Sequence, residues 1–129
     1  MKKRLWLGIA VLTSLLFLVS CVKVEYEAYV TVVNIGNMPM TAWVDGDRAD
    51  IAAYDSLTWA IPLETENEVR TVYLEAEPQG GGDYDEAIVD VYGDRDVVTW
   101  LTGWDLIGGA NRTKKKSQLI HGPAPANIK

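Results

Sequence analysis

Acidic residues gather in three short stretches of this sequence, DGDRAD, YGDRD and GDYDE. The first two contain the candidate metal ligands, which are Asp45, Asp47, Asp50, Asp94 and Asp96. The third adds Asp83, Asp85 and Glu86. Calcium takes roughly six to eight oxygen ligands, so acidic loops at one end of a β-domain could share an ion. The spacings do not fit an EF-hand, and Asp–Gly pairs also form tight turns. A structural role in turns is therefore the preferred interpretation, with calcium binding as the alternative.

The residues needed for nucleophilic catalysis are poorly represented. A catalytic triad needs a nucleophile, a base and an orienting group. The only histidine is His121, close to the carboxyl end, and Ser56 stands alone at the start of an expected strand. A pair of carboxylates could cleave glycosides, but such enzymes need a deep cleft, which so small a domain rarely builds. We therefore expect a non-enzymatic protein.

Aromatic side chains provide a third kind of candidate site. Trp59 and Trp100 are expected in the hydrophobic core, where large rings contribute most. If Ala42 and Val44 point inward, strand alternation turns Trp43 outward, where it could stack on a sugar or anchor a protein interface. The alternative is that a loop or a second sheet covers Trp43. The remaining ligand-binding candidates, for the same reason, are Tyr29 and Tyr92.

The amino terminus has the pattern of a secretory signal. Three basic residues at positions 2–4 precede an uncharged apolar run over residues 5–19. A spanning helix needs roughly 20 apolar residues, so length alone also allows an uncleaved anchor. The run ends in LVSC, residues 18–21, which holds the only cysteine of the chain. This tetrapeptide resembles the lipobox of bacterial lipoproteins.

The lipobox resemblance implies where the protein resides and how it is held there. It implies cleavage between Ser20 and Cys21, a diacylglycerol on the Cys21 thiol, and acylation of the new amino group with a fatty acid such as palmitate. Each buried CH₂ contributes about 0.8 kcal/mol, so two or three chains anchor stably. Val22, in place of aspartate, resembles the signal for sorting to the outer membrane. The expected location is therefore the outer membrane of the cell envelope, with attachment by lipid alone.

Charge narrows the range of partners. The chain has 12 basic and 18 acidic residues, and three of the basic ones lie in the signal, which leaves the mature part with a net charge of −9. That balance disfavours nucleic acid, whose phosphates need a basic surface. Apart from the lipid, no cofactor is implied. We expect a non-catalytic binding or structural module whose partner is an envelope protein or a glycan. The alternatives are a carbohydrate-binding module that uses Trp43 and a calcium-stabilised adhesion domain.

Alternating apolar and polar residues predict an all-β domain over residues 21–107. Alternation over residues 22–34 predicts a first strand, and Asp45-Gly46 predicts a hairpin between MTAWV and RADIAAY. In SLTWAIPL, the residues expected to face inward are Leu57, Trp59, Ile61 and Leu63. EAIVDVYG and RDVVTWLTGW are expected to pair across YGDRD. Six or seven short strands at this spacing predict a small antiparallel, immunoglobulin-like β-sandwich after a signal-peptide helix.

The region after the predicted domain changes character. Residues 108–129 contain glycines, the TKKK run and the ending GPAPANIK, without periodicity. We expect a disordered basic tail there, although its lysines could also attract anionic lipid. The stretch NMPMTAWVDGDRADIAAYDSLTWAIPL is similar to small surface modules of the PEGA type, which share the turn formed here by Val44, Asp45 and Gly46. That resemblance implies an envelope-associated surface module.

Overall fold

The computed structural model describes residues 25–123, which form ten strands and no helix. The predicted signal peptide, with Ser20 and Cys21, lies outside the described residues. No helix that could cross a membrane occurs in residues 25–123. The strands are β1 (Tyr26–Asn34), β2 (Met40–Val44), β3 (Asp47–Ile51), β4 (Ser56–Leu63), β5 (Val69–Pro78), β6 (Asp85–Tyr92), β7 (Val97–Thr102), β8 (Trp104–Gly108), β9 (Asn111–Lys114) and β10 (Gln118–His121).

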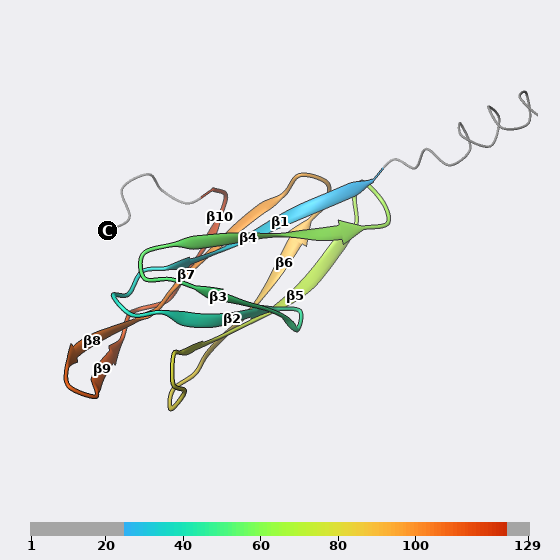
Figure 1. Cartoon of the computed structure of the whole chain (residues 1–129). Helices are drawn as coiled ribbons and strands as arrows, with labels where there is room; N and C mark the ends of the chain where they lie inside the picture. Colours follow the sequence, from blue (N-terminus) through green and yellow to red (C-terminus); the bar gives the residue numbers. More distant parts are fainter. Residues whose placement is uncertain (1–24, 124–129) are drawn as a thin grey trace, which may run out of the picture.

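The strands form two four-stranded sheets and a separate hairpin (Figure 1). The first sheet, which we call sheet A, has the order β10-β7-β1-β4. The second, sheet B, has the order β3-β2-β5-β6, and β8 pairs with β9. All pairings are antiparallel except that of β1 with β7, which is parallel. The expectation of a purely antiparallel domain was therefore wrong at this pair, because β7 follows a crossover between the sheets.

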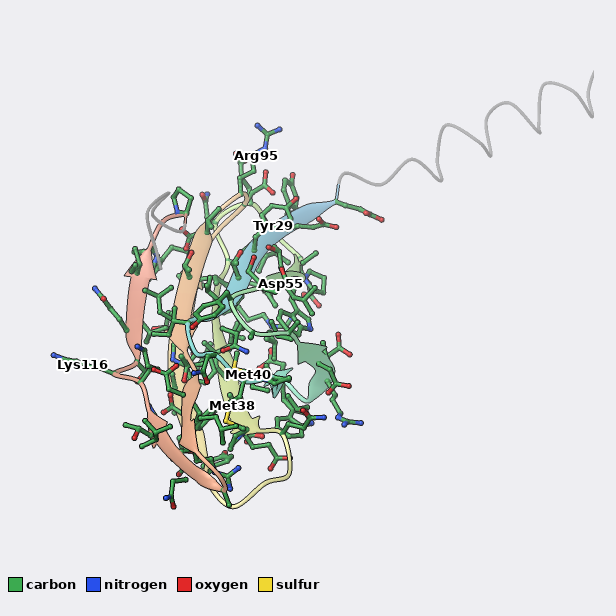
Figure 2. The ribbon with its side chains drawn as sticks, turned by 60° about the vertical axis from the view of Figure 1, so that its left-hand side comes forward. Tyr29, Met38, Met40, Asp55, Arg95 and Lys116 are labelled. Carbon is green, nitrogen blue, oxygen red and sulfur yellow. The ribbon has the colours of Figure 1, made fainter. Side chains whose placement is uncertain are left out.

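Apolar side chains from both sheets share one hydrophobic core. Sheet A supplies alternating residues of β1, such as Val30 and Val32, together with Trp100 of β7. Sheet B supplies Ala42 of β2 and Leu74 of β5, and all five of these side chains are buried. Figure 2 shows Met40 within this interior. The period of two along each strand places one face of each sheet against the core.

Several local predictions are confirmed. In β1, Ala28, Val30 and Val32 are all completely buried. The hairpin between β2 and β3 turns at Asp45 and Gly46, whose φ angles of 48° and 82° are the paired positive values of a type I′ turn. Asparagine, aspartate and glycine tolerate such angles better than other residues, which is why the dipeptide predicts the turn.

The predicted pairing across YGDRD was wrong. β6 pairs with β5 in sheet B, whereas β7 lies between β1 and β10 in sheet A. Five of the six residues of β7 are buried, including Thr99 and Leu101 on the face opposite Trp100. A strand buried on both faces suits the middle of a sheet. The turn between β6 and β7 therefore carries the chain from one sheet to the other.

The prediction of a disordered tail was also wrong for the part that the structure describes. Residues 108–123 complete β8 and form β9 and β10, which raises the strand number from the expected six or seven to ten. β10 pairs with β7 through four residues, and Lys115 N donates to Gly103 O at 2.9 Å. These short strands have little periodicity of their own; β9 pairs with the adjacent strand β8, and β10 pairs with β7. Residues 124–129 lie outside the described part.

The inward orientation predicted for β4 holds only toward one end of the strand. Ile61 and Leu63 are buried, Trp59 is half-buried, and Leu57 is exposed to 39%. β4 is an edge strand of sheet A. Leu57 pairs with Val32 at that edge, so its side chain is covered from one side only. Alternation identifies the face of a strand, but the position of the strand in the sheet decides how deeply each residue is buried.

Candidate functional site

The carboxylates proposed as metal ligands lie in two separate places, the β2–β3 hairpin and the connection between β6 and β7. Asp45 Oδ1 accepts the backbone N–H of Tyr73 at 2.8 Å, and Asp45 Oδ2 lies 3.5 Å from Arg70 Nη2. Asp50 Oδ1 accepts the Thr41 hydroxyl at 2.8 Å. Asp47 is exposed at the start of β3. The contacts of Asp45 and Asp50 thus join β2 to its neighbouring strands β3 and β5.

Asp94 and Asp96 stabilise the crossover between the two sheets. Asp94 Oδ1 accepts the Glu27 N–H at 3.0 Å. Asp96 Oδ2 accepts the Tyr92 N–H at 2.7 Å and lies 3.1 Å from His121 Nε2. Within residues 25–123, no three His, Cys, Asp or Glu side chains come close enough together to hold a metal ion. The acidic stretches are thus not brought into one cluster.

The three aromatic candidates do not share one surface. Tyr29 belongs to sheet A, and its hydroxyl donates to Glu27 Oε2 at 3.2 Å, which raises the pKa of Tyr29. Figure 2 shows Tyr29 at the same end of the molecule as Arg95. Tyr92 belongs to sheet B, and its ring centroid lies 5.3 Å from that of His121, which ends β10 of sheet A. Trp43 lies further along sheet B, half-buried between its cross-strand neighbours Arg48 and Glu75.

Trp43 faces outward, as the alternation of β2 predicts, because Ala42 and Val44 on either side are buried. It is one of many side chains on the solvent-facing side of sheet B, which we call the outer face. The register and burial patterns assign to the outer face Thr41, Trp43, Arg48, Asp50, Val69, Thr71, Tyr73, Glu75, Glu77, Glu86, Ile88, Asp90 and Tyr92.

Large apolar side chains form two cross-strand pairs on the outer face. Tyr73 of β5 lies opposite Ile88 of β6, and Val69 lies opposite Tyr92. All four are between 58% and 63% exposed. Scattered exposed apolar residues are ordinary, but a contiguous patch of them indicates a contact surface. The sequence alone did not single out Tyr73, Ile88 or Val69, because the pairing of β5 with β6 is what places them together.

The outer face is also strongly acidic. Its five carboxylates are Asp50, Glu75, Glu77, Glu86 and Asp90, and its single basic residue is Arg48. Glu75 and Glu86 lie directly opposite one another, a like-charge pair that destabilises a sheet. Tyr84 lies beside them, with its hydroxyl 3.4 Å from Glu86 Oε2. Burial, together with hydrogen bonding and repulsion from these glutamates, raises the pKa of Tyr84 to about 12.

Two shallow hollows lie along the outer face. One, of about 440 Å³, runs between β5 and β6 and is lined by Tyr73, Leu74, Glu75, Glu86, Ala87 and Ile88. The other, of about 480 Å³, lies where β2 and β3 meet the loop after β5. Polar side chains dominate its lining, among them Arg48, Asp50 and Glu77. The outer face therefore offers an apolar–acidic groove and a separate polar hollow.

A polar cluster at the far end of the molecule joins the β8–β9 hairpin to the loop between β5 and β6. Asp83 Oδ2 accepts the indole N–H of Trp104 at 2.6 Å, a bond that lowers the pKa of Asp83. Asp85 Oδ2 accepts the Thr102 hydroxyl at 2.6 Å and pairs with Lys114 Nζ at 3.1 Å. Figure 1 shows that this hairpin and loop lie away from the start of β1. These contacts join segments of the fold to one another, and no buried side-chain nitrogen or oxygen among the described residues lacks a partner.

No family model, no curated protein and no solved structure matches this chain significantly. The site must therefore be judged from its own chemistry. Among the described residues, the outer face of sheet B combines exposed aromatic rings, an excess of carboxylates over basic residues, and two hollows. It contains two of the sequence-predicted ligand-binding residues, Trp43 and Tyr92, and it excludes Tyr29.

Proposed function

We propose that this protein is a lipid-anchored lipoprotein of the bacterial envelope. Its β-domain is an immunoglobulin-like sandwich that acts as a non-catalytic binding module. The observation that carries the binding role is the outer face of sheet B, where the exposed pair Tyr73–Ile88 lies next to the pair Glu75–Glu86. Two sheets with one shared core support the sandwich architecture. The V-D-G turn at the β2–β3 hairpin agrees with the resemblance to PEGA-type surface modules.

Lipid attachment is supported by the lipobox residues 18–21 and is tested at Cys21. The wild-type protein should incorporate labelled palmitate and be processed in a globomycin-sensitive manner. A Cys21→Ser protein should remain unprocessed and unlabelled. A Ser20→Ala protein keeps a small residue before the cysteine and serves as the matched control, which should be processed normally. Equal palmitate labelling of wild type and Cys21→Ser would contradict the anchor at this residue.

The binding role of the outer face is tested by capture from the bacterium's own envelope. Lipidated wild-type protein should retain a stoichiometric protein or glycan, and Tyr73→Ala with Ile88→Ala should lose it. A matched control replaces Leu106 and Ile107, which are exposed on β8 away from sheet B. Loss of capture in the control, or none in the sheet B variant, would contradict the assignment of this face.

Carbohydrate binding is the second candidate function, and a specific observation favours it. Trp43 lies outward next to Arg48, which also lines the polar hollow of about 480 Å³. An aromatic ring beside polar groups suits a sugar, whose apolar face stacks and whose hydroxyls take hydrogen bonds. A glycan array would test this candidate with Trp43→Ala. Tyr54→Ala, another exposed aromatic residue, is the control.

A further inference from the structure

β6 presents an open edge next to the apolar–acidic groove. Tyr73 of β5 directs both backbone groups toward β2, since its N–H donates to Asp45 Oδ1 and its C=O accepts from Asp45 N. The pair Tyr73–Ile88 is therefore a non-hydrogen-bonded pair of the β5–β6 ladder. Ile88 must then direct its own backbone N–H and C=O away from β5. No strand within residues 25–123 pairs with β6 on that side.

Two other residues of β6, Glu86 and Tyr92, also direct their backbone N–H groups toward the open edge. Tyr92 donates its N–H to Asp96 Oδ2 and Glu86 donates to Asp85 Oδ1, so neither relies on β5. Ile88 and Asp90 lie between them, and among the described residues no partner strand takes up their edge-facing backbone groups. An edge strand of this kind is a template for pairing with an added strand. Natural edges are often protected by lysine or proline, and β6 has neither.

The side chains around this edge select the charge of an added strand. Glu86 and Asp90 flank Ile88 on β6, and Glu75 faces Glu86 from β5. On the outer face, Arg48 is the only basic residue, and it lies on the opposite edge strand, where it is 3.6 Å from Asp50. A cationic side chain laid across the groove would relieve the Glu75–Glu86 repulsion and contact the Tyr73 ring, which attracts cations.

We propose that the outer face binds a basic, extended polypeptide segment of an envelope protein, which adds to sheet B beside β6. Main-chain hydrogen bonds to Ile88 and Asp90 hold the segment, and its lysine or arginine side chains reach Glu75 and Glu86 across the groove. A second copy of this chain is disfavoured, because its own outer face would bring carboxylates against carboxylates. The inference rests on the proposed binding function and names its ligand class.

The test uses a short synthetic peptide of alternating lysine and threonine, titrated into the mature protein by calorimetry at low ionic strength. Three further probes are titrated in parallel: the same peptide with alternate backbone nitrogens methylated, a glutamate–threonine peptide, and chitooligosaccharides. The lysine peptide should bind, and binding should weaken steeply with added salt. The methylated and acidic peptides should bind at least tenfold more weakly.

Two protein variants separate the electrostatic contribution to peptide binding from the main-chain contribution. Glu75→Gln with Glu86→Gln should weaken binding about tenfold, whereas Glu64→Gln with Glu66→Gln, exposed in the loop after β4, should not. Ile88→Pro removes an edge-facing N–H without removing a bond to β5, and it should also weaken binding about tenfold. Circular dichroism and melting temperature confirm that each variant is folded. The methylated peptide tests edge pairing without altering the protein.

The outcomes separate this inference from the proposed function. Binding that needs both glutamates and an unmethylated peptide backbone supports a basic strand at β6. Equal binding of the methylated and unmethylated peptides overturns edge pairing, and unchanged binding to the glutamine variant overturns the charge selection. If the lysine peptide does not bind but envelope capture still depends on Tyr73 and Ile88, the inference about the ligand is overturned and the proposed binding function stands. Chitooligosaccharide binding that depends on Trp43 would replace it with the sugar-binding function.

Discussion

Asn34, at the end of β1, is completely buried and organises the loop that leads to β2. Its side-chain Nδ2 lies 2.9 Å from Met38 O and 3.2 Å from both Ile51 O and Ala52 O. Its Oδ1 accepts the Gly36 N–H at 3.0 Å. One amide thus serves backbone groups from two separate segments. Gly36 must remain a glycine, because a Cβ there would clash with the backbone carbonyl oxygen of Trp104.

We predict that Asn34→Ala lowers the free energy of unfolding by about 3 kcal/mol, because it leaves several buried backbone groups without partners. Urea denaturation measures this loss. The matched control is Asn37→Ala. The Asn37 side-chain amide hydrogen-bonds to the backbone of Leu106 at the exposed surface, so this substitution should lower the free energy of unfolding by less than about 1 kcal/mol. Equal losses in the two variants would show that burial of the Asn34 amide is unimportant.

The bond between Asp83 and Trp104 predicts a dependence of stability on pH. The indole N–H holds the pKa of Asp83 below its usual value of 3.8. A carboxyl whose folded pKa is lowered contributes stability that is fully present above the unfolded pKa and lost as pH falls through the folded pKa. Wild-type stability should therefore decline below about pH 4.

Asp83→Asn should lose this acid-dependent part while keeping an acceptor oxygen for the indole. Melting temperatures measured from pH 6 to pH 2 should fall less steeply for the variant than for wild type. Asp47→Asn is the control, because Asp47 is exposed at the start of β3, and its profile should parallel wild type. If the melting temperature of Asp83→Asn depends on pH as that of wild type does, Asp83 does not contribute to the loss of stability in acid.

At the scale of elements, β10 completes sheet A. β7 is buried on both faces, and β10 covers the side of β7 that β1 does not. Thr99 of β7 also donates its hydroxyl to Gly122 O at 2.8 Å, just beyond β10. A region expected to be a solvated tail therefore protects a central strand.

We predict that a chain ending at Lys116, which lacks β10, melts at a lower temperature and aggregates more readily. Its β7 would become an exposed apolar edge strand, which is a site for edge-to-edge association. A chain ending at Pro123 keeps every described strand and is the control. Thermal melts and light scattering compare the two. A Lys116 truncation as stable and soluble as the Pro123 truncation would make β10 dispensable.

The elements also show why strands are easier to predict than their pairing. β1 was recognisable because five of its residues alternate between core and surface within one stretch. β6 and β7 each had a strand pattern too, but the turn between them does not tell whether the chain returns to the same sheet. That choice depends on the double-sided burial of β7, to which residues of β1 and β10 contribute.

At the scale of the molecule, the acidic residues are distributed rather than clustered. Asp45 and Asp96 accept backbone N–H groups near turns, whereas Glu75 and Glu86 oppose one another across two strands of the outer face. This distribution bears on the calcium alternative, since an ion needs several oxygens at one point. Asp94 and Asp96 stabilise the crossover, whereas Asp45 and Asp50 belong to the β2–β3 hairpin of sheet B.

We therefore predict that millimolar calcium or a chelator leaves the melting temperature of the mature domain unchanged. Magnesium at the same concentration controls for general ionic effects, which screen surface charge without a specific site. Differential scanning fluorimetry provides the measurement. A rise in melting temperature with calcium and not with magnesium would restore the calcium-stabilised alternative, and Asp94→Asn with Asp96→Asn would then locate the ion.

The sequence by itself determined the features that depend on local chemistry. It predicted the all-β class, the alternation of β1, the turn at Asp45 and Gly46, and the outward orientation of Trp43, because each follows from the preferences of adjacent residues. Only the tertiary structure decided which strands pair beyond the β2–β3 hairpin, that β9 and β10 exist, and that Tyr73, Ile88, Glu75 and Glu86 share one face. The physical reason is that, apart from tight hairpins, a sheet is held by hydrogen bonds and side-chain contacts between distant segments, and a short stretch of sequence does not encode a distant partner.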